Sequence, residues 1–241
     1  MPVENLLSTE QVLYHDDHML VVDKPAGTLS DATRDPERDH MVAAARRWLR
    51  DGGKLTPSKP GHDQDVRAVH RLDRDTSGVL ILALTRPAAA ALSAELAGRR
   101  ARKCYLALVA CRTREIASEW TVSNYLRHRK GRTVRVRSGG DPAETRFVLA
   151  GRDHDRALLE VFPTTGRTHQ IRVHAADSTL PILGDPIYAP PEVGGRAPRL
   201  MLHAWFIEIA HPASGEVMRF TAPVPADLAA LAGHLSSKIP G

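Results

Sequence analysis

Short apolar runs separated by turn-forming residues dominate the hydrophobic pattern of the chain. Two runs are apolar almost throughout, VLILAL at 79–84 and KCYLALVAC at 103–111, which is typical of strands buried on both faces. Helix signals are clearest between them, where Thr85 is placed to cap a helix, Pro87 lies in its first turn and Gly98 ends it. The pattern therefore predicts a buried strand, a helix and a second buried strand in succession.

The remaining elements follow from alternation and from turn residues. Further strands are expected in four regions, a strand–turn–strand over 11–30, an exposed hairpin over 127–138, a strand over 157–163 and a closing hairpin over 201–223. Further helices are expected in three regions, 39–53 with Asp39 near its cap, 169–176 and 226–235. Because the strands arrive mostly as hairpins with helices between some of them, we expect an α+β fold. It would be a single domain over 1–241 with a mixed, mostly antiparallel central sheet flanked by helices and loops. A doubly wound parallel sheet would need a regular βαβ alternation.

The composition fits a globular protein of the cytoplasm. The hydrophobic fraction is 42% and the charged fraction 25%, and no apolar run approaches the roughly 20 residues of a membrane span. The first 20 residues lack the basic and apolar regions of a signal peptide. Cys104 and Cys111 lie seven residues apart on one predicted strand, so they would face opposite sides and stay reduced. We expect a cytoplasmic protein with no membrane partner.

Positive charge is concentrated in one part of the chain. The net charge is +5, but residues 99–137 hold twelve Lys and Arg against Glu115 and Glu119, which gives 12 − 2 = +10 and leaves −5 elsewhere. Such asymmetry favours a nucleic-acid partner, although a solvated Arg-rich hairpin would give the same pattern.

Motifs for cofactors and metals are missing from the sequence. It contains no G-x-G-x-x-G, no G-x-x-x-x-G-K-[ST] and no G-x-S-x-G. His169 and His174 are five residues apart, and on a helix their side chains would point about 140° apart, which does not suit one shared ion. We therefore predict activity without a cofactor or a metal.

Two polar turns with arginines stand next to apolar elements, HRLDRDTSG at 70–78 and GRTHQIRVH at 166–174. Asp73, at the edge of the core, would lose water and need a cationic partner, and an arginine would keep it ionised by lowering its pKa. The same turn could be purely structural. No matched second carboxylate is visible near these turns, which argues against an ordinary glycosidase, and Asp75 is expected to support the turn.

Five segments in order resemble the motifs of the RluA-type pseudouridine synthases. They are VVDKPAGTLS, HRLDRDTSGVLILA, KCYLALV, GRTHQIRVH with PILGDPIY, and RLMLHAWFIEIAHPASGE. The resemblance covers nearly the whole chain. It implies isomerisation of uridine within RNA to pseudouridine, by cleavage of the C1′–N1 bond and rejoining through C5, which needs no cofactor. Many relatives carry an S4 domain before this region, but here the motifs begin by about residue 12, so none is expected.

The resemblance also implies roles for individual residues. Asp73 would be the catalytic group, either attacking C1′ or removing a ribose proton, and both routes stay open. Arg172 would pair with Asp73 from a distant part of the chain. Tyr105 would stack on uracil or assist loss of the C5 proton, and a phenol pKa near 10 favours stacking. Ile171 would pack against the pocket or simply belong to the core.

Contacts with RNA are expected on exposed basic residues. The target uridine, in ribosomal or transfer RNA, would be flipped out of its surroundings. The candidate RNA contacts are Arg71, Arg167, Arg129, Lys130 and Arg132. Without an S4 domain, the segment 31–66 and the basic hairpin would select the target. We expect a monomer, since nothing in the sequence requires a higher oligomer. No DNA partner is expected.

Two rival functions are compatible with parts of the pattern. A non-catalytic RNA-binding protein on the same fold would not need an Asp–Arg pair, which argues against that function. A nucleoside glycosidase releasing free base would need a second carboxylate or metal ligands.

Overall fold

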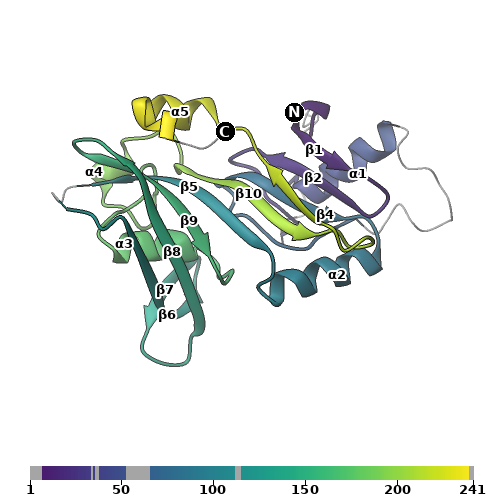
Figure 1. The fold of residues 1–241 in the computed structure, drawn as a ribbon, viewed down its shortest axis with the longest axis horizontal. Helices are drawn as coiled ribbons and strands as arrows, with labels where there is room; N and C mark the ends of the chain where they lie inside the picture. Colours follow the sequence, from purple (N-terminus) through teal and green to yellow (C-terminus); the bar gives the residue numbers. More distant parts are fainter. Residues whose placement is uncertain (1–6, 34, 36–37, 53–65, 112–114, 239–241) are drawn as a thin grey trace. The chain divides into compact units, whose positions relative to one another are not determined.

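The computed structural model describes residues 7–33, 35, 38–52, 66–111 and 115–238 (Figure 1). The chain forms two compact units. Unit 1 comprises Met1–Arg102 and Phe206–Pro223, and unit 2 comprises Lys103–Trp205 and Val224–Gly241. Residues 53–65 of the segment expected to select the target lie outside the described residues. The expectation of a single domain over 1–241 stays a prediction.

Unit 1 is built from antiparallel strand pairs and two helices. Its strands are β1 (Val12–His15), β2 (Met19–Lys24), β3 (Arg67–Ala68), β4 (Ser77–Ala83), the Phe206–Ala210 part of β10 (Leu202–Ala210) and β11 (Val217–Thr221). Its helices are the short 3-10 turn η1 (Thr9–Gln11), α1 (Met41–Asp51) and α2 (Arg86–Ala97). β2 pairs with β1 and β4, β3 pairs with β4, and β10 pairs with β11. The register places Lys24 opposite Gly78, so β2 ends where β4 begins.

The helix caps partly follow the sequence prediction. Thr85 caps α2 by accepting a hydrogen bond from the Ala88 N–H at 3.2 Å, as predicted. For α1 the prediction placed Asp39 near the cap, but the cap is His40, whose Nδ1 accepts from the Ala43 N–H at 3.3 Å. An imidazole nitrogen can accept this bond as a carboxylate oxygen does. The residue preferences used to predict N-caps favour Ser, Thr, Asp and Asn, so they do not point to histidine.

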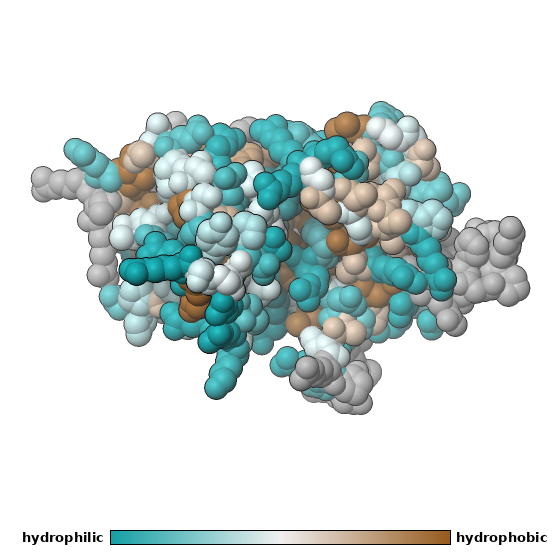
Figure 2. Space-filling view, turned by 90° about the horizontal axis from the view of Figure 1, so that it is seen from below, coloured by the Kyte–Doolittle hydropathy of each residue, from teal (hydrophilic) through white to brown (hydrophobic). Residues whose placement is uncertain are grey.

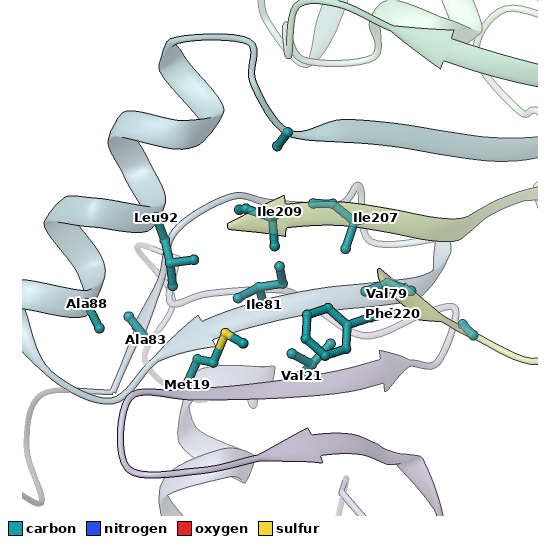
Figure 3. Close-up of a cluster of buried hydrophobic side chains, with 12 residues drawn as sticks. Met19, Val21, Val79, Ile81, Ala83, Ala88, Leu92, Ile207, Ile209 and Phe220 are labelled. Carbon is teal, nitrogen blue, oxygen red and sulfur yellow. The ribbon is translucent and has the colours of Figure 1, made fainter. Parts of the chain in front are cut away.

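The core of unit 1 lies between α2 and its strands (Figure 3). Leu92 of α2 points toward Ile81 of β4 and Ile209 of β10, and Met19 of β2 lies in the same cluster. Leu92, Ile81 and Met19 have no exposed surface. β4 is buried at every position, which explains the uninterrupted apolar run that the sequence shows there.

Unit 2 is an antiparallel sheet with helices. Its strands are β5 (Arg102–Ala110), β6 (Glu119–Arg129), β7 (Arg132–Val136), β8 (Asp141–Arg152), β9 (Arg156–Pro163) and the first residues of β10, and its helices are α3 (Gln170–Asp177), α4 (Pro191–Gly194), α5 (Ala226–Ala232) and the 3-10 turn η3 (Gly233–Lys238). The pairings run β5–β9–β8–β6–β7. Long strands β6 and β8 lie side by side (Figure 1). The hairpin expected at 127–138 is thus the end of a longer ribbon.

The sequence analysis missed β8 altogether. Its inward positions are Ala143, Thr145 and Phe147, of which one is small and one is polar. The alternation is therefore weak, and a strand defined by its neighbours rather than by its own apolar residues gives little signal.

The expected fold class is confirmed. The pairings of β1 with β2, β2 and β3 with β4, β10 with β11, and along β5–β9–β8–β6–β7 are antiparallel, an isolated bridge between Leu29 and His40 is parallel, and helices accompany the strands in both units. Cys104 and Cys111 are buried free thiols, as predicted. In the part of the chain that the structure describes, no helix has the length and apolar character to cross a membrane.

Truncation of Leu92 should destabilise the protein strongly. Leu92→Ala would leave a cavity among buried side chains and should lower the free energy of unfolding by about 2 to 5 kcal/mol. Leu96→Ala, on the same helix but only partly buried, should cost less and serves as the matched control. Denaturant titration of both variants measures the difference, and equal losses would contradict this description of the core.

Candidate active site

The turn that carries Asp73 is held by a serine from another segment of unit 1. The Ser30 hydroxyl donates to the Leu72 carbonyl at 2.9 Å and accepts from the Leu72 N–H at 3.0 Å. Both backbone groups of the residue before Asp73 are thus bound by one buried side chain. Asp73 itself is half-buried, and its carbonyl accepts from the Thr76 N–H at 3.1 Å, which closes the turn.

A buried lysine holds the other side of the same turn. The Lys24 ammonium donates to the carbonyls of Pro25, Thr28 and Arg74 at 2.9, 2.7 and 3.0 Å, so its three N–H groups have carbonyl acceptors. The Arg74 carbonyl also accepts from the Gly27 N–H at 2.9 Å, and Gly27 has φ +86°, which favours glycine. The segment VVDKPAGTLS therefore fixes the backbone on both sides of Asp73.

The neighbouring charges of the turn face solvent. Arg71 is exposed. Arg74 and Asp75 form an ion pair with each other, with Nε and Oδ1 2.8 Å apart and the arginine side chain 54% exposed. Asp75 thus binds within the turn, which agrees with the supporting role expected for it.

In unit 2, Arg172 forms a buried ion pair with Asp185. Nε and Nη2 of Arg172 donate to the two carboxylate oxygens at 2.8 and 2.7 Å, and the side chains are 5% and 1% exposed. Burial alone raises the pKa of Asp185, but bonds and charge from Arg172 and the N–H groups of Ile187 and Tyr188 hold that pKa below its ordinary value. Asp185, which the sequence analysis did not single out, is thus the carboxylate that binds Arg172 of the GRTHQIRVH segment.

The segment before Asp185 makes a close backbone approach. Gly184 has φ +74°, and a Cβ at this position would overlap the backbone carbonyl of Arg199. Only glycine satisfies both constraints. The carboxylate partner of Arg172 is thus positioned by a residue that has no side chain.

Tyr188 connects the α3 turn to the β6–β7 hairpin. Its hydroxyl accepts from the Thr133 N–H at 2.7 Å and bonds to His169 Nδ1 at 2.8 Å. The Thr133 hydroxyl donates to the Thr168 carbonyl at 2.8 Å. The Arg172 guanidinium lies 5.1 Å from the centre of the Tyr188 ring. His169 adopts φ +57°, a left-handed conformation that is uncommon for residues other than glycine.

A buried polar network lies behind Arg172. His174 has no exposed surface, and its ring nitrogens contact the Thr145 hydroxyl at 2.9 Å and the Asn124 side-chain oxygen at 3.0 Å. The Gln170 amide donates to Thr145 and to the Glu144 carbonyl, both at 2.9 Å. Burial lowers the pKa of His174 to about 4, so its ring is neutral at pH 7.

The other predicted pocket residues of unit 2 lie on β5 and α3. Tyr105 is half-buried opposite Val161, and Ile171 is buried beside Arg172. Lys103, which the sequence analysis did not single out, lies beside Gly166, the first residue of the GRTHQIR turn. Its Nζ would be 4.0 Å from a Cβ if Gly166 carried one. Burial lowers the pKa of the Lys103 ammonium. The lysine is a candidate for binding an anion beside this turn.

The predicted RNA-contacting residues of unit 2 are on its surface. Arg129, Lys130, Arg132 and Arg167 are exposed. Arg167 donates to the Pro142 carbonyl at 3.1 Å, and the Arg132 guanidinium lies 5.5 Å from the centre of the Tyr188 ring. Their contact with RNA stays a prediction.

The predicted site residues are divided between the two units. Tyr105, Ile171 and Arg172 belong to unit 2, and Asp73 belongs to unit 1. The pairing of Asp73 with Arg172 stays a prediction. Across the described residues, no group of three or more His, Cys, Asp and Glu side chains is arranged to hold a metal ion.

Comparison with known proteins assigns the chain to a family. The family model of RNA pseudouridylate synthases matches residues 18–177, which is more than half of the chain and includes Asp73, Tyr105 and Arg172. The chain belongs to the RNA pseudouridylate synthase family.

Individual members of the family resemble the chain over most of its length. Ribosomal large subunit pseudouridine synthase D of Nitrosomonas europaea is 34% identical over 92% of the chain, which spans 64% of the length of that relative. The dual-specificity RNA pseudouridine synthase RluA of Escherichia coli K12 is 36% identical over 88% of the chain and 92% of its own length. The solved structure of human RNA pseudouridylate synthase domain containing 4 has a TM-score of 0.74 at 22% identity and covers 95% of the chain and 94% of its own. This likeness confirms the pseudouridylate synthase fold.

Removal of the Ser30 hydroxyl should loosen the Asp73 turn. Ser30→Ala would leave the backbone groups of buried Leu72 without the hydroxyl and should cost about 1 to 3 kcal/mol of stability. It should also speed amide exchange at Leu72. Ser30→Thr keeps the hydroxyl and should restore slow exchange. Unchanged exchange in Ser30→Ala would contradict the role of the hydroxyl.

His174 should make stability depend on pH. Its folded-state pKa of about 4 lies below the ordinary value of 6.5, so the unfolded chain binds more protons between these values and stability falls as the pH drops from about 6.5 to about 4. The loss should be on the order of 3 kcal/mol.

Asp23 acts in the opposite direction. Burial raises its pKa to about 6, so it adds stability at low pH that is lost as the pH rises through 6. The His174 effect is therefore measured as the difference between wild type and His174→Gln in urea titrations at pH 7 and pH 5. An equal loss in both proteins on acidification would contradict the assignment.

Proposed function

We propose that the protein isomerises uridine to pseudouridine within RNA. The proposal rests on membership of the RNA pseudouridylate synthase family together with the rigid turn that presents Asp73. The chain spans 64% of the length of the relative from Nitrosomonas. The substrate and the activity are therefore proposed from the residues of this chain and are not taken over from that relative.

The reaction balances without an external reagent. The C1′–N1 bond of uridine breaks, the uracil turns within the pocket, and a new bond joins C1′ to C5. The proton on C5 leaves to solvent and N1 gains a proton, so no atom and no electron is lost overall. No group other than acids, bases and contacts for the base is required, which suits the residues at hand.

Asp73 starts the reaction in this proposal, through either attack on C1′ or removal of a ribose proton. Both routes require a carboxylate in a fixed orientation. The bonds from Ser30 to Leu72 and from Lys24 to the Arg74 carbonyl fix the backbone on either side of it. Preorganised geometry of this kind lowers the barrier because no reorientation accompanies the reaction.

The residues of unit 2 would hold the base and the RNA. Tyr105 would stack on the flipped uracil, with Ile171 as part of the pocket wall. Arg172 would offer positive charge to Asp73 or to the substrate, in an orientation set by Asp185. Arg71, Arg167 and the basic hairpin would contact phosphates.

The partner is therefore proposed to be a structured RNA with a flipped-out uridine, bound by a monomer. The relative from Nitrosomonas is named as a synthase of the ribosomal large subunit, and the relative from Escherichia coli as a dual-specificity RNA synthase. Ribosomal RNA is therefore the first substrate to test. In this proposal the protein works without a cofactor.

Replacement of Asp73 should abolish turnover and spare RNA binding. With RNA tritiated at uracil C5, Asp73→Asn should release tritium to water more than about a thousandfold slower than wild type. Asp75→Asn is the matched control, since it removes a carboxylate two residues away that pairs with exposed Arg74, and its rate should stay within about fivefold.

Three outcomes of this assay separate the competing functions. Release of tritium with the base still attached supports isomerisation. Release of free uracil would identify a glycosidase, and binding without either product would identify a non-catalytic binder. Substantial turnover by Asp73→Asn would overturn the assignment of the catalytic residue.

A further inference from the structure

The β6–β7 hairpin of unit 2 has one face that packs inward and one that faces solvent. Leu126 is 2% exposed and packs with Ala143, Val173 and Tyr188. Because side chains alternate along a strand, Tyr125 and Arg127 point to the opposite face. The register places Tyr125 opposite Val136, Arg127 opposite Val134 and Arg129 opposite Arg132. We call the outward residues Tyr125, Arg127, Arg129, Val134 and Val136 the Tyr125 face.

The inward side of the hairpin is fixed to the turn that precedes Arg172. Thr133 donates its N–H to the Tyr188 hydroxyl and its own hydroxyl to the Thr168 carbonyl. His128 Nδ1 contacts the same Thr133 hydroxyl at 3.0 Å. A partner can therefore reach the hairpin from the Tyr125 face, and this face has a defined position relative to Arg172.

The Tyr125 face exposes apolar side chains. Tyr125 is 50% exposed and Val134 is 40% exposed, and they account for two of the three large hydrophobic residues that lie exposed in the described part of the chain. Tyr125 and Val134 are diagonal neighbours across the strand pair. Figure 2 shows hydrophobic residues on one side of the molecule as small patches among hydrophilic ones, so apolar exposure is limited there.

Positive charge predominates within the hairpin that carries these apolar side chains, while the neighbouring strand β8 places Glu144 opposite Ser123 and Asp141 opposite Leu126. Residues 120–140 contain six Arg and Lys and no Asp or Glu. Arg127 is turned onto the carbonyls of Ser138 and Gly139, so Arg129 and Lys130, four and five residues beyond Tyr125 toward the turn, are the exposed cations that follow the ring along the chain. Arg132 is opposite Arg129 in the register, but its guanidinium is turned to the ring of Tyr188, 5.5 Å from its centre, which leaves Arg129 as the cation of this pair on the Tyr125 face.

We propose that the Tyr125 face binds an unpaired nucleobase of the RNA, distinct from the target uridine. The base would stack on the Tyr125 ring, and Arg129 and Lys130 would bind phosphates farther along the same RNA strand, toward the turn of the hairpin. An exposed aromatic ring followed along the strand by cations suits single-stranded RNA, because every base has a π face and every linkage a negative charge. This inference rests on the proposed function and names a second contact with the same substrate.

A purely structural role and a protein-binding role for Tyr125 predict different behaviour. A cross-strand Tyr125–Val136 pair stabilises a hairpin by itself, and it would make Tyr125 matter for folding but not for RNA. A protein partner, including a second copy of the chain, would use the apolar residues without needing the phosphate-binding cations.

The test measures binding of a fluorescein-labelled oligoadenylate of about 12 nucleotides by anisotropy, with the full chain carrying Asp73→Asn so that chemistry plays no part. Tyr125→Ala should weaken binding by roughly tenfold, while Tyr125→Phe and Tyr125→Trp should stay within about twofold of the parent. Tyr125→Leu keeps an apolar side chain without a ring and should bind as weakly as Tyr125→Ala. Val217→Ala, at an exposed apolar position of β11, should have no effect.

The dependence on salt separates stacking from charge. Tyr125→Ala should leave the slope of log affinity against log salt unchanged, whereas Arg129→Ala and Lys130→Ala should each reduce it by about one. Affinity for a duplex RNA of equal length should not respond to Tyr125→Ala.

Several results would overturn the inference. They are wild-type affinity in Tyr125→Ala, an affinity of Tyr125→Phe as weak as that of Tyr125→Ala, tight binding by Tyr125→Leu, or a Tyr125-dependent dimer in sedimentation with unchanged RNA affinity. Tritium release by the otherwise wild-type enzyme keeps the two proposals distinguishable. Release combined with RNA affinity independent of Tyr125 overturns this inference alone. Absence of release combined with Tyr125-dependent binding overturns the proposed function alone.

Discussion

The buried ion pair between Arg172 and Asp185 is the constraint around which the polar residues of unit 2 are arranged. A guanidinium that is almost wholly removed from water is tolerated only with a carboxylate in good geometry and with that carboxylate's other lone pairs satisfied. The N–H groups of Ile187 and Tyr188 meet the second condition. The pair therefore dictates the path of residues 184–188, and that path brings the Tyr188 ring beside Arg172 and its hydroxyl to the hairpin.

Unit 1 fixes its candidate catalytic group by a different means. The Asp73 turn is held through backbone groups, by a serine hydroxyl on one side and a lysine ammonium on the other. The ammonium of Lys24 binds three carbonyl dipoles, so its charge holds two loops together through their main chains. The backbone on both sides of Asp73 is thus fixed by side chains of a segment more than 40 residues earlier in the chain.

Much of this organisation could be predicted from the sequence. The apolar run at 79–84, the cap at Thr85 and the stop at Gly98 specify β4 and α2 because their signals are local. β8 could not be predicted, because its inward residues Ala143 and Thr145 are small or polar and give no apolar alternation. They suit their contacts with neighbouring strands and with Gln170, which the local sequence does not reveal. Asp185 was overlooked as a partner of Arg172 because it lies thirteen positions later in the chain, after a turn that contains a left-handed glycine. The signal that could have found it was the Gly-Asp dipeptide in PILGDPIY, a glycine placed for backbone geometry directly before a charge.

The position of Asp185 depends on the absence of a side chain at Gly184. Its hydrogen occupies the only space left beside the Arg199 carbonyl, so even a methyl group would force the chain apart and carry Asp185 with it. Arg172 would then keep its charge and its place in the sequence yet lose the carboxylate that orients it. A survey of variants limited to side chains that bind or react would omit this position, although an alanine there must displace the backbone next to Asp185.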